Sequence, residues 1–278
     1  ALPSGVHTDL EEALERAYGL QEAVVVDAGG SDADLNPALG AATAVYLETT
    51  LTGGDTVGMS SWSATLLAAV EAMRPARATV VDTVVQVVGG IGDPRVQMQA
   101  TRLIGRFAAA TGAEPLFMPT PGMLGSVSAR DALMADATVT EVVALWSRLT
   151  MVLVGIGSLE PSPLLRESGN AIAAADQELL RAAGAVGDIC LRFFDEHGEP
   201  VLSSLDERVI GIDATQLRGI PRRVGVAGGV RKHSAIRAAL LGGWVNVLIT
   251  DRAEAENLIA EAGLPLGADT PDEQGPTA

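Results

Sequence analysis

The stretch VGVAGGVRKHSAIRAALLGGWVNVLITD, residues 224–251, is the part of the chain from which its fold is best inferred. Two short runs rich in β-branched residues, Val224–Ala227 and Val245–Thr250, flank a helical pattern at Lys232–Leu241. Two such runs joined by one amphipathic helix indicate a parallel βαβ unit. The glycine pair 228–229 lies just before the helix, where free backbone N–H groups and the positive end of the helix dipole favour an anion.

Lys232 stands at this corner and is the only lysine in the chain, whereas the other 18 basic residues are arginines. A solvated lysine on the first turn of a helix is the alternative interpretation. Arginine would serve that role equally well, so the retention of one lysine favours a functional group. We therefore predict that Lys232 binds an anionic ligand.

The composition describes a large folded chain with few aromatic residues. The 278 residues are 47% hydrophobic and 3% aromatic, so the core must be built from Ala, Val, Leu and Ile. No apolar run reaches the roughly 18–20 residues that a membrane span needs. The single cysteine, Cys190, cannot form an internal disulfide and fits a reducing compartment, so we expect a cytoplasmic protein. With a net charge of −16, this polypeptide should not bind nucleic acid by itself.

Strand and helix patterns alternate along the chain, and the strands are continuously apolar. This predicts one α/β domain with a parallel sheet covered by helices on both faces. The expected strands are 22–27, 56–58, 78–88, 114–118, 150–154, 184–194 and 208–212, besides the two of the quoted stretch. The expected helices are 8–18 with Thr8 as its cap, 37–51 after a loop at 28–37, 63–73, 94–111, stretches up to 148, 170–183, 215–218 and 253–262. We expect the domain to span residues 1–262 and residues 263–278 to form a disordered tail.

Four glycine- or serine-containing loops follow predicted strands. In parallel α/β sheets, ligands bind beyond the carboxyl ends of the strands. Serines commonly cap helices and fill turns, which is the simpler interpretation of any one loop. Four such loops on one edge, together with the lone lysine, favour a ligand cleft. The loops are Gly58–Ser63, Gly89–Gly92, Gly155–Ser158 and Gly228–Lys232.

Several cofactor motifs are absent from the sequence. Neither GGIG nor GIGSLE completes the dinucleotide fingerprint G-x-G-x-x-G, and no ATP-binding G-x-x-x-x-G-K-[ST] occurs. The histidines His7, His197 and His233 lie far apart without the spacing of metal ligands. The sequence therefore predicts no cofactor and no metal.

Asp188 is the acidic residue of greatest interest, because it follows a glycine in an otherwise apolar strand. A carboxylate there could accept sugar hydroxyl groups or act as a general base. The alternative is a strand-end aspartate satisfied by backbone N–H groups. Cys190, two residues on, is expected to point the same way and to be a small buried apolar group.

Together these motifs resemble the C-terminal effector-binding domain of the SorC family of sugar-responsive transcriptional regulators, often grouped with the DeoR type. The matching stretches follow in the right order from Thr52 to Ile259. They are TGGDTVGMSSWSATL, VVGGIGDP, VGIGSLEP, GAVGDICLRFFDEHGEPV, and the long segment that begins RVIGIDATQLRGIPRR and continues through the quoted stretch.

The resemblance implies a Rossmann-like fold similar to ribose-5-phosphate isomerase and glucosamine-6-phosphate deaminase. It also implies a sugar or sugar phosphate as effector, a dimeric or tetrameric assembly, and control of operator DNA through an attached domain. The family's N-terminal helix-turn-helix is absent from this chain.

Carried over by motif, the phosphate would be held by Gly58, Met59, Ser60, Ser61, Ser63 and Lys232. The sugar would be contacted by Gly90, Gln97, Gly157 and Asp188. The family usually has Trp-Gly and Thr in the first loop, whereas this chain has Trp62-Ser63 and Thr65. The phosphate is therefore expected to sit differently, or the effector to be unphosphorylated.

An enzyme of the same fold is the alternative. A sugar-phosphate isomerase or deaminase would use Asp188 as base and Lys232 as electrophile. A deaminase commonly has an acidic-Gly-His run after the glycine loop, and the corresponding stretch here, Gly157–Pro161, contains no histidine. We therefore predict a sugar sensor rather than an enzyme.

Overall fold

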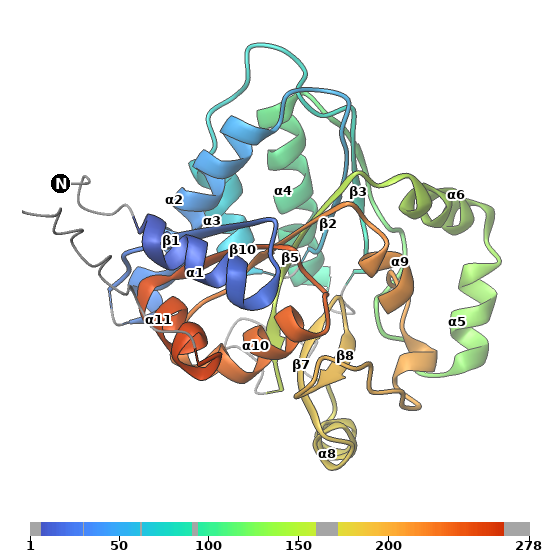
Figure 1. The fold of residues 1–278 in the computed structure, drawn as a ribbon. Helices are drawn as coiled ribbons and strands as arrows, with labels where there is room; N and C mark the ends of the chain where they lie inside the picture. Colours follow the sequence, from blue (N-terminus) through green and yellow to red (C-terminus); the bar gives the residue numbers. More distant parts are fainter. Residues whose placement is uncertain (1–6, 30, 62, 91–93, 160–171, 264–278) are drawn as a thin grey trace, which may run out of the picture.

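A seven-stranded parallel sheet forms the centre of the molecule (Figure 1). The computed structural model describes residues 7–29, 31–61, 63–90, 94–159 and 172–263, with backbone alone at residues 32 and 94–100. The strand order is β1-β10-β9-β5-β2-β3-β4, and every neighbouring pair is parallel, which confirms the predicted parallel sheet. The strands are β1 Glu22–Val26, β2 Thr56–Met59, β3 Thr83–Gln86, β4 Glu114–Leu116, β5 Met151–Gly155, β9 Arg222–Val226 and β10 Val247–Asp251.

The stretch from 224 to 251 forms the predicted βαβ unit. Strands β9 and β10 pair in parallel with Val224 opposite Val247, and helix α10, His233–Leu241, connects them. The helix begins one residue later than predicted, because residues 230–232 form a 3₁₀ turn and Lys232 takes the N-cap position. Gly229 has φ of +84°, a backbone conformation that favours glycine at the start of this turn.

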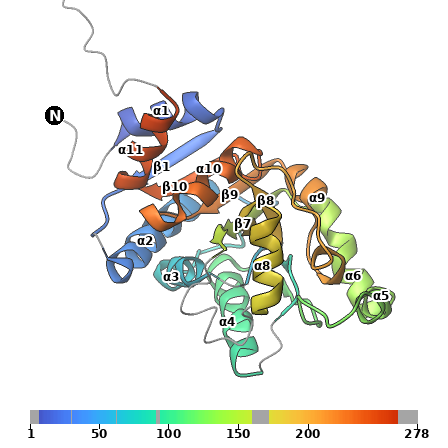
Figure 2. The same ribbon diagram turned by 90° about the horizontal axis from the view of Figure 1, so that it is seen from below.

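Helices cover both faces of the sheet, as predicted (Figure 2). Side chains alternate through the sheet: Met59 and Leu153 belong to the core on one face, and Val152 and Val154 belong to the core on the other. The first face is covered by α2 Asp32–Thr50, α3 Ala64–Ala72 and α4 Pro94–Thr111. The second is covered by α1 Thr8–Tyr18, α6 Ala137–Leu145, α10 and α11 Arg252–Glu261. The shorter elements α5 Val127–Met134, η1 Trp146–Arg148, η2 Asp206–Arg208 and α9 Ala214–Arg218 lie in the connections.

A second, antiparallel sheet continues from the carboxyl end of β5. Its order is β6-β7-β8, with β6 Gly157–Ser158, β7 Ala185–Ile189 and β8 Arg192–Asp195. Helix α8, Ala174–Ala182, packs on it through a small cluster that includes Leu180 and Phe193. This sheet was not predicted from the sequence.

The prediction of one extended segment over 184–194 was wrong. The chain reverses at Cys190 and Leu191, whose φ angles are +56° and +64°. Turns of this kind normally contain Gly or Asn, and their absence hid the hairpin. Cys190 is therefore not in the strand with Asp188, although it is buried as predicted.

Two further expected strands differ from those in the structure. The expected strand over 208–212 forms isolated bridges, at Val209 and Gly211, with residues of the β3 and β4 connections. The expected strand over 78–88 is shortened to Thr83–Gln86, because its partner β2 begins only at Thr56, opposite Thr83.

Two helix starts were also misplaced. The expected loop over 28–37 contains the start of α2, because the Ser31 hydroxyl accepts a hydrogen bond from the Asp34 N–H and caps the helix at Asp32. Helix α1 begins at Thr8 itself with His7 before it, so Thr8 is not the cap. Helix α1 ends at Tyr18, the expected last residue, and Gly19 follows it with φ of +65°.

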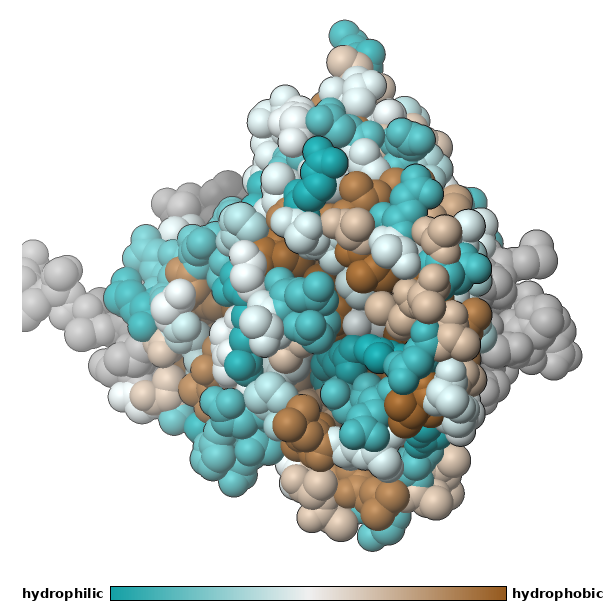
Figure 3. All heavy atoms as spheres, turned by 90° about the vertical axis from the view of Figure 1, so that its right-hand side faces the viewer, coloured by the Kyte–Doolittle hydropathy of each residue, from teal (hydrophilic) through white to brown (hydrophobic). Residues whose placement is uncertain are grey.

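Hydrophilic and hydrophobic atoms are interspersed over the face that bears α5 and α6 (Figure 3). Apolar atoms gather at its lower end, at the level of α8, and Leu179 of α8 is 58% exposed. Among the described residues, no helix is both long and apolar enough to cross a membrane.

Candidate functional site

The four predicted loops leave four neighbouring strands. They follow β3, β2, β5 and β9, which lie side by side in the sheet, and parallel pairing brings their carboxyl ends to one edge. The chain runs outward from β2 to β3 and β4 and then returns to β5 on the other side of β2. The β2–β5 boundary is therefore the point where the winding direction reverses, which is where ligands bind in such sheets.

The three serines of the loop after β2 have different hydrogen-bond partners. Ser60 and Ser61 are buried, with 7% and 4% exposure. The Ser60 hydroxyl accepts a hydrogen bond from the Gly155 N–H of the β5 loop (3.4 Å), and the Ser61 hydroxyl accepts one from Gln86 Nε2 (3.0 Å). The Ser63 hydroxyl caps α3 by accepting the Leu66 N–H (3.2 Å). In the described part of the chain, no acceptor is assigned to any of these three hydroxyls, so the loop can offer hydrogen bonds without a positive charge.

Gly58 and Met59, predicted as phosphate contacts, lie within β2 itself. The Met59 side chain is fully buried in the core, so it presents nothing to a ligand. A Cβ at Gly58 would approach Val87 and Leu149 within 2.7 and 2.8 Å, which gives this glycine a packing role. Any contact that these two residues make with an effector would have to come from the backbone.

The hairpin β7–β8 holds Asp188 against the β5 loop. Gly157 is the antiparallel partner of Asp188, and a Cβ at Gly157 would overlap Asp188 Oδ1. Asp188 Oδ2 accepts the Leu191 N–H at 3.1 Å. Burial raises the pKa of Asp188 to about 6, and the Leu191 N–H and the charge of Lys232 only partly oppose this. The structure thus brings the predicted residues Gly157 and Asp188 together.

Lys232 reaches the same loop from the turn that follows β9. Its ammonium group donates to the Ile156 carbonyl at 2.8 Å. Burial lowers the pKa of Lys232, while the charge of Asp188 opposes that shift. A carboxylate and an ammonium group therefore both lie at the two-residue segment Ile156–Gly157, at the carboxyl end of the central strand.

Asp251 positions the turn that carries Lys232, and we did not predict it. Its Oδ1 accepts the Gly229 N–H at 2.7 Å, and its Oδ2 accepts the Glu254 N–H at 3.2 Å and so caps α11. Asp followed three residues later by Glu is a helix-start pattern, so the signal was present in the sequence.

His233, the residue after Lys232, lies between two carboxylates of α11. Its Nδ1 is 2.9 Å from Glu254 Oε1 and its Nε2 is 2.6 Å from Glu261 Oε2. Burial alone would lower the pKa of His233, but the hydrogen bonds and charges of Glu261 and Glu254 raise it overall. Burial raises the pKa of Glu254 to about 7, against the effect of His233. This histidine therefore links α10 to α11 through two hydrogen bonds.

In the second glycine loop, the backbone of Gly90 is hydrogen-bonded to the chain segment that follows β4. The Gly90 N–H donates to the Thr120 carbonyl at 2.6 Å, and the Gly90 carbonyl accepts the Gly122 N–H at 2.5 Å. This pairing uses the amide of Gly90, so a sugar contact there would have to be made by its carbonyl or Cα. The side chain of Gln97 lies outside the described residues, and its predicted role stays a prediction.

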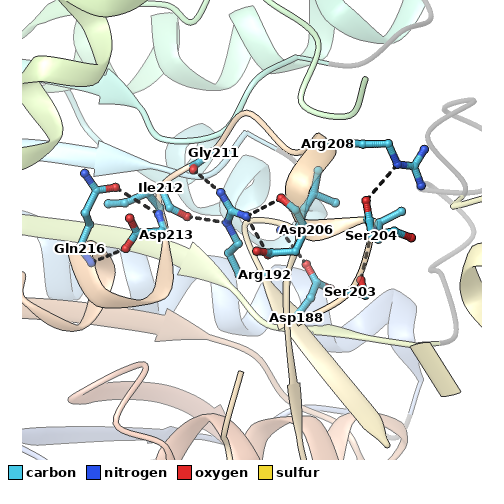
Figure 4. A network of polar contacts seen from close by, with 12 residues as sticks. Asp188, Arg192, Ser203, Ser204, Asp206, Arg208, Gly211, Ile212, Asp213 and Gln216 are labelled. Atoms are coloured by element: carbon cyan, nitrogen blue, oxygen red, sulfur yellow. Dashed lines mark hydrogen bonds and ion pairs between the residues drawn. The ribbon is translucent and has the colours of Figure 1, made fainter. Parts of the chain in front are cut away.

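Arg192 is the centre of a polar network beside the site (Figure 4). It is 8% exposed, and its guanidinium donates to the carbonyls of Ile212 (3.1 Å), Gly211 (2.8 Å) and Asp206 (3.0 Å). It also pairs with Asp206 Oδ1 at 2.7 Å. Most of its partners are backbone atoms, so no side-chain pattern in the sequence indicated this network.

Comparison with known proteins decides the family. A family model described as "Putative sugar-binding domain" matches residues 4–260. The deoxyribonucleoside regulator of Bacillus subtilis (strain 168) is 34% identical over 247 residues, which are 88% of this chain and 78% of that protein. The chain belongs to this sugar-binding domain family.

Other members of the family agree with this assignment. The sorbitol operon regulator of Klebsiella pneumoniae is 31% identical over 255 residues, 90% of this chain and 79% of that protein. The crystal structure of the full-length sorbitol operon regulator SorC from the same organism has a TM-score of 0.81 and 28% identity, covering 93% of this chain and 83% of that chain. The predicted relationship to SorC- and DeoR-type regulators is confirmed. The likeness to isomerases and deaminases stays a prediction.

Proposed function

We propose that this sugar-binding domain is the effector sensor of a bacterial transcriptional regulator and that its effector binds at the carboxyl edge of the sheet. The observation that carries the proposal is the meeting of Asp188 and Lys232 at the β5 loop. An acceptor for hydroxyl groups and a donor for an anion both lie at Ile156–Gly157, beside the winding reversal of the sheet.

A sugar phosphate fits the chemistry of these groups best. The phosphate would lie between Lys232 and the serine loop, where the N-terminus of α3 and the hydroxyls of Ser60, Ser61 and Ser63 face the same edge. The sugar hydroxyls would donate to the Asp188 carboxylate. Since Ser63 replaces a glycine usual in the family, and its hydroxyl caps α3, an unphosphorylated sugar or polyol is the second candidate.

We propose a sensing rather than a catalytic role. The named relatives are regulators, one of deoxyribonucleosides and one of a sorbitol operon. An isomerase would use Asp188 as base and Lys232 as electrophile, and the test is whether a bound ligand is chemically changed.

The signal would be passed on by assembly. Effector binding would favour one arrangement of a dimer or tetramer through its differential affinity for two states, and so change how attached DNA-binding domains fit operator half-sites. This chain itself, with a net charge of −16, would contribute no affinity for DNA phosphates, and we place the regulator in the cytoplasm.

A thermal-shift screen tests the proposal. Ribose, glucose, sorbitol and erythritol would each be compared with its terminal phosphate ester, with inorganic phosphate as a control. A ligand at about 100 times its Kd should stabilise the fold by about 2.7 kcal/mol. Recovery of the ligand unchanged after incubation supports the sensor, whereas conversion makes the domain an enzyme. No shift with any of these compounds would contradict the proposal.

A further inference from the structure

The turn that places Asp188 is strained. Cys190 and Leu191 both have positive φ, at +56° and +64°, and neither is a glycine or an asparagine. Such residues persist only where their surroundings hold them in place, and they concentrate at functional sites. The strained turn has a direct consequence for the site, because the Leu191 N–H is the group that holds Asp188 Oδ2 (3.1 Å).

Arg192 follows the turn and anchors it. Its guanidinium makes bonds to three carbonyls and one carboxylate, all from residues 206–212. Figure 4 shows the guanidinium enclosed between Gly211 and Ile212 on one side and Asp206 on the other. A guanidinium buried to this degree is tolerated only when its donors are paired in fixed geometry, so Arg192 holds residues 206–212 and the hairpin in one relative position.

Residues 206–212 are in turn bonded to the second glycine loop. The Ile210 carbonyl accepts the Gly89 N–H at 2.8 Å, and the Ile212 N–H donates to the Val87 carbonyl at 2.8 Å. Arg192 therefore connects the hairpin that bears Asp188 with the end of β3, on the far side of the site from Lys232.

We propose that Arg192 is a positioning residue for the effector. It holds the strained Cys190–Leu191 turn, and so the Asp188 carboxylate, in register with the glycine loop after β3. Effector affinity then depends on Arg192 although its guanidinium donates to protein atoms, through four hydrogen bonds. This inference rests on the proposed function, because it requires that Asp188 contacts the effector.

A double-mutant cycle separates positioning from a general structural effect. The probe is whichever of ribose 5-phosphate, glucose 6-phosphate and sorbitol 6-phosphate binds the unmodified domain most tightly in calorimetry. We expect Arg192→Lys to weaken that probe about tenfold. In an Asp188→Asn background, Arg192→Lys should add less than about twofold, because the group that it positions is already lost. Fold-changes that multiply would overturn the inference.

Arg208 supplies the matched control. It lies on the same segment and pairs with Asp176 of α8 at 3.1 Å. Arg208→Lys should therefore leave the affinity within about twofold. If Arg192→Lys does not fold, Asp206→Asn removes the carboxylate from the network and keeps the three carbonyl acceptors. We expect a smaller loss, about threefold, with the same absence of an added effect in the Asp188→Asn background.

A second readout needs no ligand. Amide hydrogen exchange of Leu191 reports the bond to Asp188 directly. Arg192→Lys, or Asp206→Asn in its place, should speed this exchange about tenfold or more, while Arg208→Lys leaves it unchanged. An unaltered Leu191 amide would refute the positioning role even if no probe binds. If Asp188→Asn leaves probe affinity unchanged, the proposed effector site fails instead, so the two failures are distinguishable.

Discussion

The Asp188 carboxylate should destabilise the free domain, and Asp188→Asn should therefore stabilise it. Burial raises the pKa of this group from 3.8 to about 6. At 1.36 kcal/mol for each pKa unit, the folded state loses about 3 kcal/mol when Asp188 ionises at neutral pH. Asparagine has nearly the same shape, and its carbonyl oxygen can still accept the Leu191 N–H, so the substitution removes the charge and keeps the turn.

The pH dependence identifies the origin of this gain. Between pH 3.8 and about 6 the folded protein binds more protons at Asp188 than the unfolded chain does. The stability of the unmodified domain therefore falls as pH rises through this window. The advantage of Asp188→Asn should grow from between about 1 and 2 kcal/mol at pH 5 to about 3 kcal/mol at pH 8.

Urea unfolding of both proteins at pH 5, 6, 7 and 8, followed by circular dichroism, measures this difference. Calorimetry with the probe ligand would be run on the same samples, because the stabilised variant should bind the effector more weakly. A variant that is less stable at every pH, or a difference that does not change with pH, would refute the reasoning. The carboxylate would then be better solvated than its surroundings indicate.

Three further substitutions test other parts of the site. Lys232→Met should weaken a sugar phosphate by about 1.5–3 kcal/mol and its unphosphorylated counterpart by much less, as measured by calorimetry; equal losses would remove the phosphate from Lys232. Gly157→Ala should abolish binding in the same assay with a folded circular dichroism spectrum, because its methyl group would displace the Asp188 carboxylate; unchanged affinity would place the ligand elsewhere. Ser63→Ala should lower the unfolding free energy by about 1 kcal/mol through loss of the α3 cap, and a stability within error would show that Leu66 has another acceptor.

The parallel sheet was predictable because its signals are local. Four of the apolar runs are followed by glycine- or serine-containing loops, and parallel pairing brings these loops to one edge without further information. The meeting of Lys232 with the β5 loop follows from that topology.

The antiparallel hairpin lacked a local signal. The turn at Cys190 and Leu191 contains neither Gly nor Asn, and its backbone is held by tertiary contacts of Arg192 with residues 206–212. For the same reason, the prediction that the serine hydroxyls contact a phosphate did not include their hydrogen bonds to other parts of the protein. Gln86, which bonds to Ser61, lies on another strand, so burial of that hydroxyl depends on strand order.

The two ionisable groups at the β5 loop, Asp188 and Lys232, are both largely buried. Burial shifts the pKa of Asp188 upward and that of Lys232 downward, so for each group the fold favours the neutral form. An ordinary surface pair would not be enclosed in this way, and a pair needed for stability would make a direct ion pair. Lys232 instead donates to a backbone carbonyl, and Asp188 accepts a backbone N–H. The two groups thus lie at Ile156–Gly157 with separate backbone partners, and a bound hydroxyl and a bound anion would stabilise the charged form of both. Effector affinity should accordingly decline as pH falls below about 6, where Asp188 takes up its proton.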